Sequence, residues 1–186
     1  MNDLFGIKKG TLLIASPQIE DPFFAKSVIA LCEHSPQGSF GLIINKPIET
    51  DLPDELFDTQ MLINPEIKML LSGPNQTNQL MLVHGSKKEE NTLEICPDVY
   101  LGGNLEFLQS EADKSSGSPI LLCFGYTGWG PRELERDLEN GLWFTMEGQK
   151  EHFFETSPSS LWKELLRKKG GKYALLANIP DDLSLN

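Results

Sequence analysis

Residues 120–133 read ILLCFGYTGWGPRE and carry the clearest structural signal in the chain. The five apolar residues 120–124 have the length and composition of a buried strand. The glycines that follow let the backbone bend or come close to another group, and a proline then stands where a helix can begin. The stretch therefore predicts a strand over 120–124, a glycine-rich loop over Gly125–Pro131 and a helix over Pro131–Asn140.

This glycine-rich loop has two interpretations. In the first it is a structural turn, with Tyr126 and Trp129 as packing anchors. In the second it faces a ligand, because free N–H groups at a helix start attract anions and Arg132 would add a charged fork. Glu133 and Glu135 would repel an anion from the same place. The spacing also matches neither the dinucleotide-binding G-x-G-x-x-G motif nor a P-loop.

Outward from this stretch, short apolar runs bounded by turn residues predict many strands and few helices. Further strands are predicted at 10–16, 27–33, 40–45, 67–71, 80–84, 93–100 and 142–146. Further helices are predicted at 51–57, 104–112 and 158–169. The strands at 27–33 and 40–45 are too close in sequence for a parallel crossover and should form a hairpin. We expect an α+β fold with a mixed β-sheet flanked by helices, and a three-layer α/β sandwich is the alternative.

Length and charge narrow the class of protein. A chain of 186 residues predicts one compact domain over 1–186, with residues 181–186 as a frayed tail. The 16 basic and 27 acidic residues give a net charge of −11, and the pI is near 4.7. Such a surface repels phosphate backbones, so direct nucleic-acid binding is not expected. A protein partner or a small-molecule ligand is expected instead.

The N-terminal order of charges and the short apolar runs predict neither a secretion signal nor a membrane span, so we expect a cytoplasmic protein. Cys32, Cys96 and Cys123 form an odd set without a C-x-x-C pair. We expect them to be reduced thiols that serve as small hydrophobic residues. The histidines show no metal-ligand spacing, so neither a metal nor another cofactor is expected.

Polar residues end several predicted strands and could converge on a ligand. His34 and His84 each end a strand, and Asn45 and Lys46 close another. The candidate ligand-binding set joins them to the glycine-rich loop: His34, Asn45, Lys46, His84, Tyr126, Gly128, Trp129, Gly130 and Arg132. This hypothesis requires that His34 and His84 lie in one concave site. Each histidine, including His152, is also explained as a hydrogen-bonded structural residue, and no catalytic residue is assigned because no nucleophile motif is present.

The chain resembles the AlgH/YqgE-like family of bacterial proteins in spaced blocks over nearly its whole length. These blocks are Gly10–Pro17, Cys32–His34, Gly41–Pro47, Gly73–Pro74, Val83–His84, Gly125–Pro131, Leu134–Glu135, Trp143 and Ser157–Trp162. Two departures stand out: Ser72 replaces a usual glycine, and Arg132-Glu133 replaces a usual Gly-Gln pair. A ligand role of the family's glutamine would therefore not transfer to Glu133.

The resemblance implies a compact α/β fold with a mixed sheet and flanking helices, and it implies no established activity. The name of one branch reflects a proposed role in transcriptional regulation. We therefore expect, first, a regulatory or interaction protein that acts on transcription indirectly and without catalysis. The alternative is a small-molecule, nucleotide or anion-binding protein, or a hydrolase-like enzyme, that uses the Gly125–Pro131 loop. A third interpretation is that these motifs serve folding alone.

Overall fold

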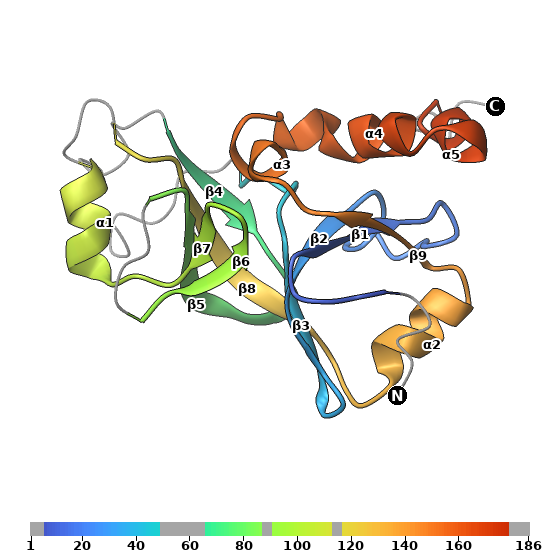
Figure 1. Ribbon diagram of the computed structural model, residues 1–186, viewed down its shortest axis with the longest axis horizontal. Helices are drawn as coiled ribbons and strands as arrows, with labels where there is room; N and C mark the ends of the chain where they lie inside the picture. Colours follow the sequence, from blue (N-terminus) through green and yellow to red (C-terminus); the bar gives the residue numbers. More distant parts are fainter. Residues whose placement is uncertain (1–5, 49–65, 87–90, 113–116, 179–186) are drawn as a thin grey trace.

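Nine strands and five helices make up the part of the chain that the structure describes (Figure 1). The computed structural model describes residues 6–48, 66–86, 91–112 and 117–178. The strands are β1 Thr11–Ala15, β2 Val28–Ser35, β3 Gly38–Ile43, β4 Ile67–Leu71, β5 Asn75–His84, β6 Leu93–Cys96, β7 Val99–Leu101, β8 Ile120–Trp129 and β9 Trp143–Glu147. The helices are α1 Leu105–Ala112, α2 Glu133–Glu139, α3 Lys150–Phe154, α4 Pro158–Lys169 and α5 Gly171–Leu176. None of these helices is long and apolar enough to cross a membrane.

The strands form a mixed, mainly antiparallel sheet in the order β6-β7-β5-β8-β3-β2-β1-β9. β4 is a parallel partner of β8, whereas β2 and β3 form the predicted antiparallel hairpin. The sheet curls (Figure 1). Residues next to both of its edge strands come close to Gly10. At the β9 edge, the Gly148 N–H donates to the Gly10 carbonyl over 2.9 Å. At the β6 edge, a Cβ on Gly10 would lie 2.5 Å from the Ile95 carbonyl oxygen.

Strand β8 corrects the prediction of a loop after residue 124. It continues to Trp129, pairing with β4 and β5 in its first part and with β3 in its last. Gly125 permits close contact between backbones within the strand. A Cβ on Gly73 would lie 1.9 Å from the Tyr126 carbonyl carbon, and one on Gly125 would lie 2.4 Å from the Gly73 carbonyl oxygen.

Other predicted elements need smaller corrections. The predicted strand 93–100 is two strands, β6 and β7, because the chain turns at Asp98, where φ is +61°. The helix predicted from Pro131 begins at Glu133, since Arg132 has a left-handed φ of +62°. The predictions for β4 and α4 are confirmed, and α3 and α5 were not predicted. The predicted helix 51–57 and the tail 181–186 lie outside the described residues.

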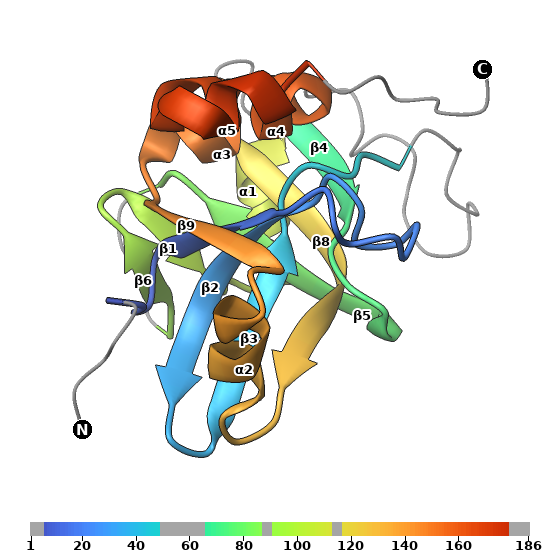
Figure 2. The ribbon, with the colours of Figure 1, turned by 90° about the vertical axis from the view of Figure 1, so that its right-hand side faces the viewer.

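Side chains alternate between two buried faces along β1. Leu12 and Ile14 belong to a central apolar cluster that includes residues of α3 and α4, whereas Leu13 and Ala15 belong to a second cluster that includes residues of α2. Figures 1 and 2 show α3, α4 and α5 on one side of β1 and β9, with α2 on the other. A third cluster lies among β5, β8 and α1. Helices thus flank β1 on both faces, as in the three-layer alternative, but the mainly antiparallel sheet is that of an α+β fold.

The three cysteines are free and buried, in agreement with the sequence analysis. Burial raises the pKa of Cys123 to about 12 and that of Cys96 to about 11. Burial also raises the pKa of Cys32 far above its ordinary value. These thiols therefore stay protonated at neutral pH and act as small packing residues.

Candidate functional site

The structure does not bring the predicted ligand-binding residues into one site. His84 pairs with Ile120 at one end of β8. His34 contacts Ser39, which pairs with Trp129 at the other end. A strand of ten residues is about 30 Å long. The prediction that His34 and His84 share a concave site is therefore wrong, because β8 holds them apart.

Both histidines are held by their neighbours. The Nδ1 atom of His34 lies 2.8 Å from the Ser39 hydroxyl across the β2–β3 hairpin. His84 is fully buried, and its ring centre lies 5.8 Å from that of Tyr100 and 4.5 Å from that of Phe107. These contacts are typical of structural residues, and a ligand role for either histidine stays a prediction.

The aromatic residues of the predicted loop also make packing contacts. Trp129 donates its Nε1–H to Asp137 over 3.0 Å, and its ring meets that of Trp143 edge-on at 6.3 Å between centres. Tyr126 packs edge-on against Phe40 with ring centres 5.6 Å apart. These contacts support the interpretation of both residues as packing anchors.

The remaining predicted loop residues have local structural explanations. Gly128 pairs with Phe40 in the ladder between β3 and β8. The Gly130 N–H donates to the Glu133 carboxylate over 2.8 Å, so that donor is already engaged. Arg132 is exposed at the start of α2, a helix of seven residues. The structure thus favours a structural role for these residues, mostly within a strand rather than a turn, and the ligand interpretation stays untested.

Asn45 and Lys46, in contrast, lie together in a cleft of about 370 Å³. We term it the lysine cleft, and its lining residues are Ala25, Lys26, Asn45, Lys46, Pro47, Pro158, Ser159, Trp162 and Lys163. Its three lysines come from three segments of the chain: the turn before β2, the segment after β3, and α4. Lysine side chains from distant parts of the sequence therefore line one concavity.

Asn45 joins two walls of the lysine cleft. Its Oδ1 atom accepts the Val28 N–H over 2.7 Å, and its Nδ2 donates to the Lys26 carbonyl over 2.9 Å. The amide side chain thus ties the segment after β3 to the turn before β2, where Lys26 has a positive φ of 56°. Asn45 is a positioning residue that sets the place of Lys26 relative to Lys46.

The lysines of the cleft contact the protein while they line the cavity. Lys46 Nζ donates to the Pro22 carbonyl over 3.1 Å. Burial lowers the pKa of Lys46, and the nearby Asp21 carboxylate opposes this shift. Lys26 Nζ lies 5.7 Å from the centre of the Trp162 ring. Since an ammonium has three N–H donors, Lys46 can bind a ligand as well as the Pro22 carbonyl.

Sequence reasoning selects Lys46 but neither Lys26 nor Lys163. No spacing motif connects these positions, because they meet through the folding of distant segments. Lys163 also lies in an amphipathic helix, where a lysine on the polar face needs no further explanation. The one sequence signal near this cleft was Ser157-Pro158, which predicts the start of α4. It does not predict which other segments of the chain lie beside that helix start.

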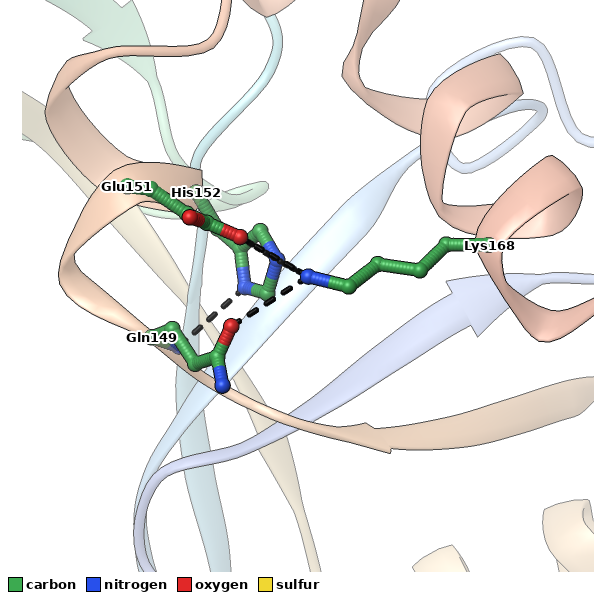
Figure 3. Close-up of polar contacts among 4 residues, drawn as sticks. All are labelled: Gln149, Glu151, His152 and Lys168. Atoms are coloured by element: carbon green, nitrogen blue, oxygen red, sulfur yellow. Dashed lines mark hydrogen bonds and ion pairs between the residues drawn. The ribbon is translucent and has the colours of Figure 1, made fainter.

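A second polar cluster joins α3 to the C-terminal part of α4 (Figure 3). Lys168 Nζ donates to Glu151 Oε1 over 2.8 Å and to Gln149 Oε1 over 3.2 Å. The Gln149 backbone N–H donates to His152 Nδ1 over 3.1 Å. We term these four residues the α3–α4 cluster, and each of them has at least one partner within it.

His152 has a structural role in the α3–α4 cluster. Because its Nδ1 accepts a backbone N–H, the neutral ring carries its proton on Nε2, which lies 3.4 Å from Glu151 Oε1. Burial lowers the pKa of His152, the Lys168 ammonium lowers it further, and the Glu151 carboxylate opposes both. The imidazole is therefore held neutral as a hydrogen-bonded residue, in agreement with the structural interpretation.

An acidic cavity of about 620 Å³ lies beside this cluster. Its lining residues are Pro97, Asp98, Glu147, Gly148, Gln149, Lys150, Glu151 and Glu155. Across residues 6–48, 66–86, 91–112 and 117–178, no group of three or more His, Cys, Asp or Glu is placed to hold a metal ion. The acidic cavity thus offers negative charge without metal-binding geometry among those residues.

The fold and the lysine cleft define an α+β protein with a curled, mainly antiparallel sheet and a lysine-lined cleft at the start of α4. The AlgH-like family profile matches residues 12–174, and the chain belongs to this family. A UPF0301 protein of Chlamydia pneumoniae is 49% identical over 181 residues, which are 97% of this chain and 96% of that protein. A UPF0301 protein of Chlorobium limicola is 30% identical over 189 residues and is matched over 100% of both chains.

Two solved structures share the fold. The crystal structure of a Corynebacterium diphtheriae protein has a TM-score of 0.75, with 20% identity over 92% of each chain, which is a likeness of fold alone. The solution structure of the AlgH protein from Pseudomonas aeruginosa has a TM-score of 0.70, with 27% identity over 94% of this chain and 95% of the other. The resemblance noted in the sequence is thereby confirmed at the level of family and fold.

Proposed function

We propose that this protein is a regulatory protein that binds a small anionic ligand in the lysine cleft. The observation that carries the proposal is the meeting of Lys26, Lys46 and Lys163 around one cavity in a chain of net charge −11. An ammonium has three N–H donors, so a lysine that already has a partner in the protein can also donate to an anion in the cavity. The proposal moves the ligand away from the Gly125–Pro131 loop.

The environment of Lys46 supports an anionic ligand. Burial lowers the pKa of Lys46, which means that its surroundings disfavour the charged form. An anion bound beside the ammonium would favour the charged form and raise the pKa again. Perturbed ionisable groups in clefts are common at binding sites.

The turn before β2 supports a regulatory role. Lys46 binds the Pro22 carbonyl of this turn, and Phe24 of the same turn packs edge-on against Trp143 of β9, with ring centres 6.3 Å apart. Phe24 and Trp143 belong to the apolar cluster that includes residues of α2. A ligand held by Lys46 would therefore also fix a turn that reaches the α2 side of the sheet.

Five side chains of reactive type have structural explanations. His34 and His152 make hydrogen bonds that explain their positions. Cys32, Cys96 and Cys123 are buried thiols with raised pKa values. None of these five residues needs a hydrolytic role to explain its position.

A thermal-shift experiment tests the proposal with phosphate, sulfate, acetate and citrate as probes. A probe present at 100 times its Kd should raise the Tm by about 5–10 °C. The shift should be lost in Lys46→Gln and Lys163→Gln. It should persist in Lys9→Gln, which removes an exposed lysine outside the cleft.

Two outcomes would contradict anion binding in this cleft. The first is a shift that persists in Lys46→Gln and Lys163→Gln. The second is the absence of any shift from all four probes at millimolar concentration. Either result would leave the interaction with a protein partner as the function to pursue, starting from affinity capture.

A further inference from the structure

We infer that the outer edge of β9 binds an extended, acidic segment of a protein partner, which adds to the sheet as a further antiparallel strand. This edge is separate from the lysine cleft, because no residue of β9 lines that cleft. β9 stands at one end of the strand order, and in the described part of the chain it pairs with β1 alone. An edge strand of this kind is a template for a partner strand.

The hydrogen bonds at the two ends of β9 show which of its residues bond to β1. Before the strand, the Leu142 carbonyl accepts the Ser16 N–H over 2.9 Å. After the strand, the Gly148 N–H donates to the Gly10 carbonyl over 2.9 Å. Along an antiparallel strand, residues that bond to the neighbour alternate with residues that bond away from it. The even-numbered residues from 142 to 148 therefore direct their backbone groups to β1.

The odd-numbered residues of β9 direct their backbone N–H and C=O groups away from the sheet. These residues are Trp143, Thr145 and Glu147. One contact agrees with this assignment: Lys169 Nζ, which belongs to α4, donates to the Thr145 carbonyl over 2.9 Å. Among the residues that the structure describes, no strand pairs with this outward row. The row therefore offers backbone donors and acceptors to a further strand.

The surface beside this edge is basic on the side of α4 and α5, which Figure 2 shows opposite to α2. Lys169 Nζ and Lys172 Nζ lie 4.9 and 5.3 Å from the centre of the Tyr173 ring. This ring packs edge-on against that of Phe144 in β9, with centres 4.8 Å apart. The contacts of the two ammonium groups are thus to a ring and a carbonyl, both uncharged. The ion pairs found among the described residues involve neither lysine.

These charges favour an acidic partner strand. Alternate side chains of an added strand point to the α4–α5 side of the sheet, where the two lysines lie. Carboxylates at those positions would form ion pairs with the lysines. Lys169 can also keep the Thr145 carbonyl, because an ammonium has three N–H donors. The other side chains of the strand would lie on the α2 side beside Thr145 and Glu147, where uncharged residues fit best.

A second copy of this chain fits the edge less well. Two β9 strands paired around a two-fold axis would place the α4–α5 sides of both copies on the same face of the joint sheet. Lys169 and Lys172 of one copy would then lie near the same lysines of the other, and like charges repel. The charges therefore favour a different, acidic segment over self-pairing.

Fluorescence anisotropy of labelled peptides tests the inference at constant ionic strength. One peptide of about six residues alternates valine with aspartate, and a second alternates valine with lysine. The aspartate peptide should bind at least about tenfold more tightly than the lysine peptide. The double variant Lys169→Gln/Lys172→Gln should weaken aspartate-peptide binding about fivefold. Arg167→Gln should leave it unchanged, because Arg167 is exposed on α4 and lines a cavity against α3.

N-methylation of the aspartate peptide separates strand addition from simple charge attraction. In the antiparallel arrangement the valine N–H groups point to β9, whereas the aspartate N–H groups point to solvent. N-methylation of the valines should therefore weaken binding at least about tenfold, and N-methylation of the aspartates should leave it unchanged. Thr145→Pro removes an outward N–H while it leaves the bonds to β1 in place, so it should also weaken binding. Thr145→Val, which keeps this N–H, should not.

The outcomes are decisive in either direction. Any other effect of the two N-methylations would overturn antiparallel strand addition, and equal binding of the aspartate and lysine peptides would overturn the acidic partner. No binding of either peptide at millimolar concentration would overturn the inference as a whole. Self-association in sedimentation velocity that is lost in Thr145→Pro would assign the edge to a second copy instead. The N-methylated peptides are tested on the unaltered protein, so the experiment stays decisive if Thr145→Pro fails to fold.

Discussion

The two ends of α4 both carry lysines, but in opposite surroundings. At the C-terminal end, Lys168 donates to oxygens of Gln149 and Glu151 in the α3–α4 cluster. At the N-terminal end, three lysines from three segments line one cavity. The acceptors of Lys168 belong to α3, so this lysine joins two helices, whereas the lysines at the N-terminal end line a cavity that a ligand could enter. The arrangement of the charges, rather than the presence of lysine, distinguishes a structural cluster from a candidate binding site.

We expect the largest effect from replacing Trp162, which belongs to the central apolar cluster and also lines the lysine cleft. Its side chain is 3% exposed, and its Nε1–H donates to the Ala15 carbonyl over 2.8 Å. We expect Trp162→Ala to lower the free energy of unfolding by about 3–5 kcal/mol, measured by urea denaturation. Trp162→Phe, which retains an aromatic ring, should lose less. A loss below about 1 kcal/mol for Trp162→Ala would contradict this anchoring role.

His152→Ala tests whether the α3–α4 cluster, at the C-terminal end of α4, has a structural role. The side chain is 4% exposed and accepts the Gln149 backbone N–H, so its removal leaves a void and an unsatisfied donor. We expect a loss of about 2 kcal/mol in the free energy of unfolding, with anion binding by the folded variant unchanged. A variant that is fully stable but binds no anion would contradict both the structural role of the α3–α4 cluster and the placement of the binding site in the lysine cleft.

The pH dependence of the free energy of unfolding gives a second test of the structural role of His152. The pKa of His152 is lower in the folded protein than its ordinary value of 6.5, so the unfolded chain takes up its proton first as the pH falls. The stabilisation by neutral His152 is therefore complete above about pH 6.5 and is lost as the pH falls toward the lower, folded pKa. Urea unfolding between pH 7.5 and pH 5.5 should show this decline. His152→Gln should reduce the slope, and an unchanged slope would remove His152 as its source.

The smallest expected effect on stability is at Lys46, where the effect on binding should be large. Lys46→Gln removes a charge that burial disfavours and one hydrogen bond to the Pro22 carbonyl, two changes of opposite sign. The free energy of unfolding should therefore change by less than about 0.5 kcal/mol, while anion affinity falls about tenfold. Urea denaturation and titration of the same preparation provide both values. A large loss of stability would place Lys46 with the structural residues.

The extent of strand β8 could not be predicted from the local sequence alone. Its first five residues were predicted as a buried strand, but its glycines were interpreted as a loop. Glycine has two uses, bending and close approach, and the sequence does not distinguish them. The choice depends on what lies nearby, and here the backbone at Gly73 lies against that at Tyr126. The same uncertainty led us to include the glycine-rich stretch in the candidate site, and its ligand role stays a prediction.

Local sequence was sufficient for elements whose signals lie within the element. The helix predicted over 158–169 matches α4, because a proline at its start, an apolar stripe and Gly170 at its end all act over short range. The family was also evident from spaced motifs. Which charged side chains meet was settled by long-range packing, since Lys26, Lys46 and Lys163 come together through strand pairing and helix docking. Such contacts join residues far apart in the chain, so no local pattern records them.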